Sequence, residues 1–181
     1  MSLLIQYTIL YASVLILVAL GGCFSEHSGV INLGLEGIMV MGALGGALTM
    51  KYMIGYPPAV IVILTILAAA VTGLVFSALL AVACINFKAD QTIVGTALNM
   101  LGLAAATVIV KAINIAENPD NVSATVQYIA QKKSFLVNIG GFEFNWMMLV
   151  ALVILIAAYI VLYKTKFGLR LMACGEHPQA A

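Results

Sequence analysis

The sequence predicts an all-α membrane protein, a polytopic helical bundle with about five membrane-spanning helices. Of its 181 residues, 64% are hydrophobic and only 8% are charged, compared with about 25% charged residues in a soluble domain. The mean hydropathy is +1.13, and several apolar segments are long enough to cross a hydrocarbon core of ~30 Å. A soluble enzyme is therefore excluded. The Lys and Arg residues are scattered, so the chain also lacks the basic stripe of a nucleic-acid-binding protein.

The first two predicted spans cover residues 3–20 and 31–53. Residues 3–20 could also be a signal peptide, but no Lys or Arg precedes them and four further apolar segments follow. The second span is less regular because Asn32 and Glu36 lie near its start, four positions apart and so on one helix face. A carboxylate there must face protein or water rather than lipid. We expect either a partly broken helix that lines a cavity, or a Glu36 that only pairs with a neighbouring backbone group or cation.

A polar connection precedes the second span and contains Glu26 and His27 among Gly and Ser residues. We predict a solvated interfacial loop there. The third, fourth and fifth spans are predicted at residues 59–85, 92–110 and 146–163. Trp146 and Tyr163 mark the two interfaces of the last one.

Residues 111–145 form the long polar connection between the fourth and fifth spans. Five crossings divide the eight Lys and Arg residues evenly between the two sides of the membrane. Their number alone therefore gives almost no indication of the orientation by the positive-inside rule. Three cations directly after the fifth span, Lys164, Lys166 and Arg170, favour a cytoplasmic C-terminal end. Residues 111–145 are then predicted to lie outside.

Small and polar residues recur at helical spacing in the fourth span. Gln91, Gly95 and Asn99 follow one another every four residues and so share one face. Lipid does not accommodate such a face, so it should point into the bundle, where Asn99 either hydrogen-bonds to another helix or touches a polar substrate. In the second span, Gly42-x-x-x-Gly46 predicts close approach of another helix.

The sequence shows no catalytic or metal-binding constellation. Cys23, Cys84 and Cys174 are far apart and near no pair of histidines, which argues against a disulfide framework and a zinc site. No nucleophile is paired with a base. We therefore predict no enzymatic activity, no metal and no cofactor on this chain.

Residues 164–181 contain the sequence GLRLMACGEHPQAA. It resembles the cytoplasmic loop, of general form GxRxxAxGExPxAA, in inner-membrane permeases of bacterial ABC importers for sugars, nucleosides and branched-chain amino acids. Two further blocks, GGCFSEHSGVINLGLEGIMVMGAL and DQTIVGTALNML, are similar to the nucleoside and simple-sugar branch of this family. His177 departs from the Asn that the family more often has there, and Met172 and Cys174 also differ from the commoner residues.

The resemblance implies a permease subunit in the bacterial plasma membrane that imports nucleosides or simple sugars by alternating access. It also implies three partners: a cytoplasmic ATPase that binds ATP and Mg²⁺, a second homologous permease, and an extracytoplasmic substrate-binding protein. By motif match, the residues expected to couple the permease to the ATPase are Gly168, Arg170, Gly175, Glu176 and Pro178. Because family members are longer, we expect this chain to be an N-terminal fragment whose coupling loop is truncated.

A dry path for nucleosides or sugars needs hydrogen-bonding side chains, and the candidates are Asn32, Glu36, Gln91 and Asn99. Three alternatives stay open. The chain could belong to a permease for branched-chain amino acids, or it could be a small membrane scaffold or passive pore that associates through Gly42 and Gly46. A self-contained secondary transporter is disfavoured because no internal repeat of hydropathy is visible.

Overall fold

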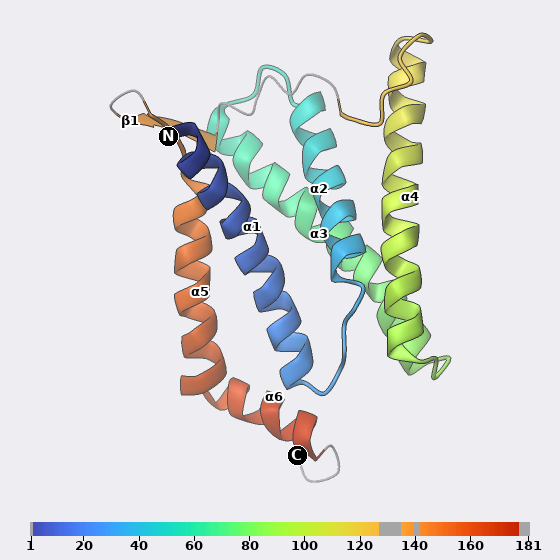
Figure 1. Ribbon diagram of the computed structural model, residues 1–181, viewed down its shortest axis with the longest axis vertical. Helices are drawn as coiled ribbons and strands as arrows, with labels where there is room; N and C mark the ends of the chain where they lie inside the picture. Colours follow the sequence, from blue (N-terminus) through green and yellow to red (C-terminus); the bar gives the residue numbers. More distant parts are fainter. Residues whose placement is uncertain (1, 127–134, 140–141, 178–181) are drawn as a thin grey trace. The chain divides into compact units, whose positions relative to one another are not determined.

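The computed structural model describes residues 2–126, 135–139 and 142–177 (Figure 1). Its elements, in chain order, are α1 (Ser2–His27), α2 (Leu35–Tyr52), α3 (Pro58–Ile85), α4 (Gln91–Glu117), β1 (Leu136–Ile139), β2 (Phe142–Asn145), α5 (Met147–Lys164) and α6 (Lys166–Glu176). They form two packing units. The first contains α1, β1, β2, α5 and α6, and the second contains α2, α3 and α4.

The predicted all-α membrane class is confirmed. Within the described residues, four helices are long and apolar enough to cross a membrane, and they correspond to α1, α3, α4 and α5. The remaining predicted span corresponds to α2, an 18-residue helix with Glu36 in its first turn and Lys51 in its last.

The first helix is longer than predicted. Glu26 and His27 belong to its last turn, so the expected interfacial loop at these two residues is wrong. The helix ends at His27, and two residues later Gly29 adopts a φ of +79°, a conformation that glycine tolerates without steric cost.

The second helix begins later than predicted. Asn32 precedes α2, which starts at Leu35 with Gly34 as its N-cap. The spacing of four residues therefore does not place Asn32 and Glu36 on one helix face, and that expectation was wrong. The start of α2 depends on which groups hydrogen-bond to its first backbone N–H groups. The periodicity of the side chains carries no information about those partners.

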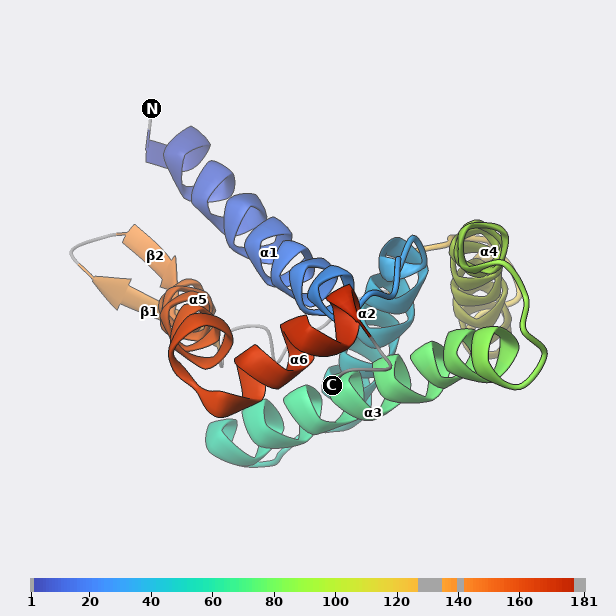
Figure 2. The same cartoon turned by 90° about the horizontal axis from the view of Figure 1, so that it is seen from below.

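The polar segment between the fourth and fifth spans contains regular structure at both ends. Helix α4 continues past Val110 to Glu117. Strands β1 and β2 then pair antiparallel, with Leu136 opposite Asn145, just before α5 (Figure 2). The Trp146 N–H donates to the Phe135 carbonyl at 3.3 Å, and the two rings stack with centroids 6.1 Å apart.

In the second unit, α2 packs against both α3 and α4. One buried cluster joins α2 to α4 through Leu44, Ala106 and Val110. Another joins α3 to α4 through Phe76, Leu80 and Leu98. In the first unit, α5 buries Met148, Ala151, Ala158 and Leu162 and packs against α1.

Candidate functional site

The start of α2 is held by a side chain from α4. The N-cap residue Gly34 provides no side-chain acceptor, which would leave the backbone N–H of Gly37 in the first turn without a partner. Asn99 Oδ1 accepts a hydrogen bond from that N–H at 2.8 Å, and Asn99 Nδ2 donates to the Leu33 carbonyl at 2.6 Å. Only this orientation of the amide satisfies both backbone groups. Asn99 therefore acts as a helix cap contributed by a different helix.

Glycines allow the two backbones to come this close. A Cβ added to Gly102 would lie 2.7 Å from the Gly37 Cα, and one added to Gly95 would lie 3.0 Å from the Gly34 N. Gly95, Asn99 and Gly102 thus form one face of α4, directed at the start of α2. We call this arrangement the Asn99 clamp, made of Leu33, Gly37, Gly95, Asn99 and Gly102.

The residue pattern of the fourth span predicted part of this face but not all of it. It identified Gly95 and Asn99 but not Gly102, although Gly102 lies seven positions after Gly95 and so continues the same helix face. It also left both alternatives for Asn99 open. The structure shows that both ends of the Asn99 amide bond to backbone atoms, at Gly37 in α2 and at Leu33 just before it. The partners of Asn99 at Leu33 and Gly37 are backbone groups. Because every residue has such groups, no side-chain pattern in the sequence could have identified these two as the partners.

Two other predicted path residues lie at helix N-termini. Glu36 is exposed in the first turn of α2, where a carboxylate interacts favourably with the helix dipole. Within the described part of the chain, no side chain forms an ion pair with Glu36. Gln91 is the first residue of α4, half-buried, and follows the N-cap Asp90, whose Oδ1 accepts from the Thr92 N–H at 2.8 Å. Asn32 lies in the segment before α2.

The predicted coupling segment folds into helix α6. Thr165 is its N-cap and accepts a hydrogen bond from the Gly168 N–H at 3.4 Å. Gly168 is buried, whereas Arg170 and Glu176 are exposed. Pro178, the last predicted coupling residue, lies outside the described residues. The exposed residues of α6 include two cations, Lys166 and Arg170, one anion, Glu176, and the apolar Leu169.

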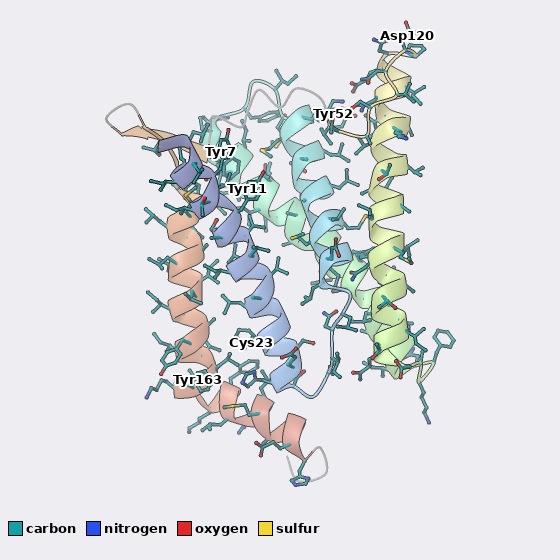
Figure 3. The ribbon with its side chains drawn as sticks, viewed as in Figure 1. Tyr7, Tyr11, Cys23, Tyr52, Asp120 and Tyr163 are labelled. Carbon is teal, nitrogen blue, oxygen red and sulfur yellow. The ribbon has the colours of Figure 1, made fainter. Side chains whose placement is uncertain are left out.

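The side chains of the first unit near α6 are visible in Figure 3. Cys23 lies in the last turns of α1 and Tyr163 at the end of α5. His27 Nδ1 lies 2.8 Å from the Cys23 carbonyl, and its ring meets that of Tyr163 edge to face with centroids 6.2 Å apart. Among the described residues, no group of His, Cys, Asp and Glu side chains could hold a metal ion.

The family model described as the permease component of the branched-chain amino acid transport system matches residues 4–181. The chain belongs to this permease family. It is 39% identical over 187 residues to the guanosine ABC transporter permease protein NupQ of Bacillus subtilis. It is 35% identical over 185 residues to the nucleoside ABC transporter permease protein NupC of Lactococcus lactis. Both alignments cover 100% of this chain and 58% of the relative, and no solved structure matches.

Membership of this permease family, together with the four apolar helices, shows a multi-pass plasma-membrane protein. The predicted relationship to ABC importer permeases, including those for nucleosides, is confirmed. The chain spans little more than half the length of these two relatives.

Proposed function

We propose that this chain belongs to a permease subunit that imports nucleosides in an ATP-driven ABC transporter. The observation that carries the proposal is the alignment of the whole chain with two permeases named for guanosine and nucleoside transport, at 39% and 35% identity. The substrate undergoes no chemical change. In this proposal the chain contributes part of the substrate path and the helix α6, which transmits motion from the ATPase, and it contributes no catalytic site.

The complete transporter contains three kinds of partner in this proposal. A cytoplasmic ATPase binds ATP and Mg²⁺ and docks on α6, where Arg170 and Glu176 are exposed. A second homologous permease completes the path, and an extracytoplasmic binding protein delivers the substrate. Gly168 has a different part in coupling, because it is buried against the end of α5 rather than presented to a partner.

The path itself is assigned to polar groups at the starts of α2 and α4. Glu36 and Gln91 are the candidates for hydrogen bonds to ribose hydroxyls or base amide groups, and Asn32 is a candidate from the segment before α2. Asn99 supports these groups by holding the backbone from which Glu36 projects. This division of roles follows from the two hydrogen bonds that the Asn99 amide makes to backbone atoms.

The first test is uptake of radiolabelled guanosine by cells that carry the full-length gene with its neighbouring genes, compared with cells lacking only the permease. We expect permease-dependent uptake that stops when ATP is depleted. Uptake of pentoses but not of nucleosides would contradict the substrate assignment and keep the importer. If no solute tested is taken up in an energy-dependent way, the importer proposal fails and a scaffold becomes the better explanation.

The same cells test the coupling assignment. Arg170→Ala and Glu176→Ala should each leave the ATPase bound while reducing uptake per ATP hydrolysed. Cys174→Ser is the matched control, because Cys174 is also exposed on α6 but is outside the proposed coupling set. Full uptake in both coupling variants would disprove the role of these two side chains.

A further inference from the structure

The C-terminal end of α6 touches the end of α1 through backbone atoms. A Cβ added to Gly175 would collide with the His27 carbonyl oxygen and lie 3.0 Å from the Gly29 N. Conversely, a Cβ added to Gly29 would lie 3.0 Å from the Gly175 Cα and 3.3 Å from its carbonyl oxygen. Figure 2 shows α6 running from the end of α5 to the end of α1. Any side chain at either glycine would separate the two backbones.

The end of α1 is a well-ordered surface for this contact. The Val30 N–H donates to the Ser25 carbonyl at 3.2 Å, and the Gly29 N–H donates to the Glu26 carbonyl at 3.0 Å. With Gly29 at a φ of +79°, this pattern is a Schellman motif. The Ser25 hydroxyl also donates to the Val30 carbonyl at 2.7 Å. These bonds hold the turn that Gly175 contacts in one conformation.

The opposite end of α6 is braced against α5. A Cβ on Gly168 would collide with the backbone carbonyl of Leu162, so the two helices meet without a side chain between them there as well. Thr165 Oγ1 donates to the Val161 carbonyl at 2.6 Å, besides capping α6. Helix α6 therefore cannot tilt freely about its connection to α5.

A ring contact completes the arrangement, because His27 at the end of α1 meets Tyr163 at the end of α5. We call the set His27, Gly29, Tyr163, Gly168 and Gly175 the α6 joint. Its members join three helix ends within one packing unit. They are buried or half-buried except for Tyr163 and Gly29, so they are suited to packing within the chain rather than to docking an ATPase.

We propose that Gly175 is a positioning residue that transmits the displacement of α6 to α1, so that α1, α5 and α6 move as one body during transport. This inference rests on the proposed function. It separates the α6 residues into two groups, an exposed one that meets the ATPase and a packed one that passes the motion on. Because α2 starts only six positions after Gly29, a displacement of the end of α1 also acts on the segment that leads into α2.

The first experiment compares Gly175→Ala with the unmodified full-length permease, assembled with its partners in proteoliposomes. The added methyl group would force α6 away from His27, so uptake per ATP hydrolysed should fall about tenfold or more, while ATPase binding and hydrolysis persist. The matched control is Gly73→Ala on α3, where the nearest atom to an added Cβ is 3.8 Å away. An unchanged ratio of uptake to hydrolysis in Gly175→Ala would overturn the inference.

A second experiment covers the case in which Gly175→Ala fails to assemble. Ser28→Cys is combined with the native, exposed Cys174, with Cys23 and Cys84 replaced by Ala, and the pair is linked by a short bifunctional maleimide. If α1 and α6 move together, the linked permease keeps its uptake per ATP hydrolysed. Failure to link, or loss of uptake on linking, would overturn the inference, and Cys174→Ser provides the unlinked control.

The unmodified permease distinguishes this inference from the proposal on which it rests. If it shows no ATP-dependent nucleoside or sugar uptake, the proposed function fails and the joint has no motion to transmit. If it transports normally while the Gly175→Ala and cross-linking results both go against expectation, only the joint is wrong.

Discussion

At the scale of the residue, Asn99 shows how one polar side chain in a membrane helix can be structural. A polar amide is costly among lipid tails unless its hydrogen bonds are made. Asn99 makes them with the Leu33 carbonyl and the Gly37 N–H, two backbone groups that helix α2 leaves unpaired at its start. The same bonds satisfy the side chain and the helix end. This reciprocity explains how α2 begins at Leu35 although its N-cap residue, Gly34, has no capping side chain.

Asn99→Ala should therefore reduce stability before it affects substrate binding. Loss of a helix cap costs about 1 kcal/mol, and we expect a lower unfolding temperature of the detergent-solubilised full-length permease. Asn99→Asp should also destabilise the protein, because a carboxylate oxygen would then face the Leu33 carbonyl. Thr96→Ala is the control, since the Thr96 hydroxyl bonds to its own helix at the Thr92 carbonyl, 3.0 Å away.

The uptake kinetics of the same variants decide between the two roles of Asn99. A structural clamp predicts fewer active transporters with an unchanged KM for nucleoside. A raised KM in Asn99→Ala with an unchanged unfolding temperature would instead identify Asn99 as a direct substrate contact.

At the scale of the element, α2 uses glycines to approach two neighbours closely. Gly37 meets α4 at the Asn99 clamp, while Gly42 and Gly46 meet α3 near Ala69. The Gly42-x-x-x-Gly46 motif is thus used within the chain. This use removes the feature on which a scaffold that associates through that motif depended, because the motif is already covered by α3.

An ion pair joins the C-terminal ends of α2 and α4. Lys51 Nζ lies 2.7 Å from Glu117 Oε1, with the Glu117 side chain 49% exposed. Such a partly exposed pair contributes up to about 1 kcal/mol. Nearby, buried Asn114 donates to the Ser123 and Thr125 carbonyls, each at 2.9 Å, and so holds the segment after α4 against that helix.

Gly102→Ala tests the close approach of α2 and α4. The added methyl group would meet the Gly37 backbone at 2.7 to 2.8 Å, and overpacking of this kind costs about 1–3 kcal/mol. We expect a lower unfolding temperature and a weakened Asn99 clamp. Gly73→Ala, where the added methyl group would make an ordinary van der Waals contact with Ile38 at 3.8 Å, should leave the unfolding temperature unchanged or raise it, because alanine has the higher helix propensity. Equal behaviour of the two variants would contradict this account.

At the scale of the whole molecule, the first packing unit constrains how often the chain crosses the membrane. The C-terminal ends of α1 and α5 both meet α6, an 11-residue helix that is only about 16 Å long at 1.5 Å per residue. Helices α1 and α5 therefore cross in the same direction. The chain between them must cross an odd number of times, and α3 and α4 alone supply two crossings. We infer that α2 crosses as well, so that the described helices make five crossings.

Cysteine accessibility tests this topology in the full-length permease with its native cysteines replaced. A membrane-impermeant thiol reagent applied from outside should label Ile54→Cys, after α2, but not Val30→Cys, before it. Both positions are exposed, Ile54 at 77% and Val30 at 37%. Labelling of both cysteines from the same side would show that α2 does not cross.

The sequence by itself determined the membrane class, the helices and the family. Hydropathy and length are summed along the chain, so they identified every described helix except the short α6, which was expected only as a cytoplasmic loop. The periodicity of Gly95 and Asn99 also predicted which face of α4 points inward. These inferences need only neighbouring residues, and for that reason they succeeded without the tertiary structure.

Only the tertiary structure decided what those faces contact. The partners of Asn99 are backbone atoms some 60 positions away, and backbone atoms leave no pattern in a sequence. The same holds for Gly175, whose neighbours His27 and Gly29 lie near the opposite end of the chain. The second span was predicted to begin at residue 31, whereas α2 begins at Leu35, since a helix end is set by the groups that satisfy its unpaired N–H and C=O groups.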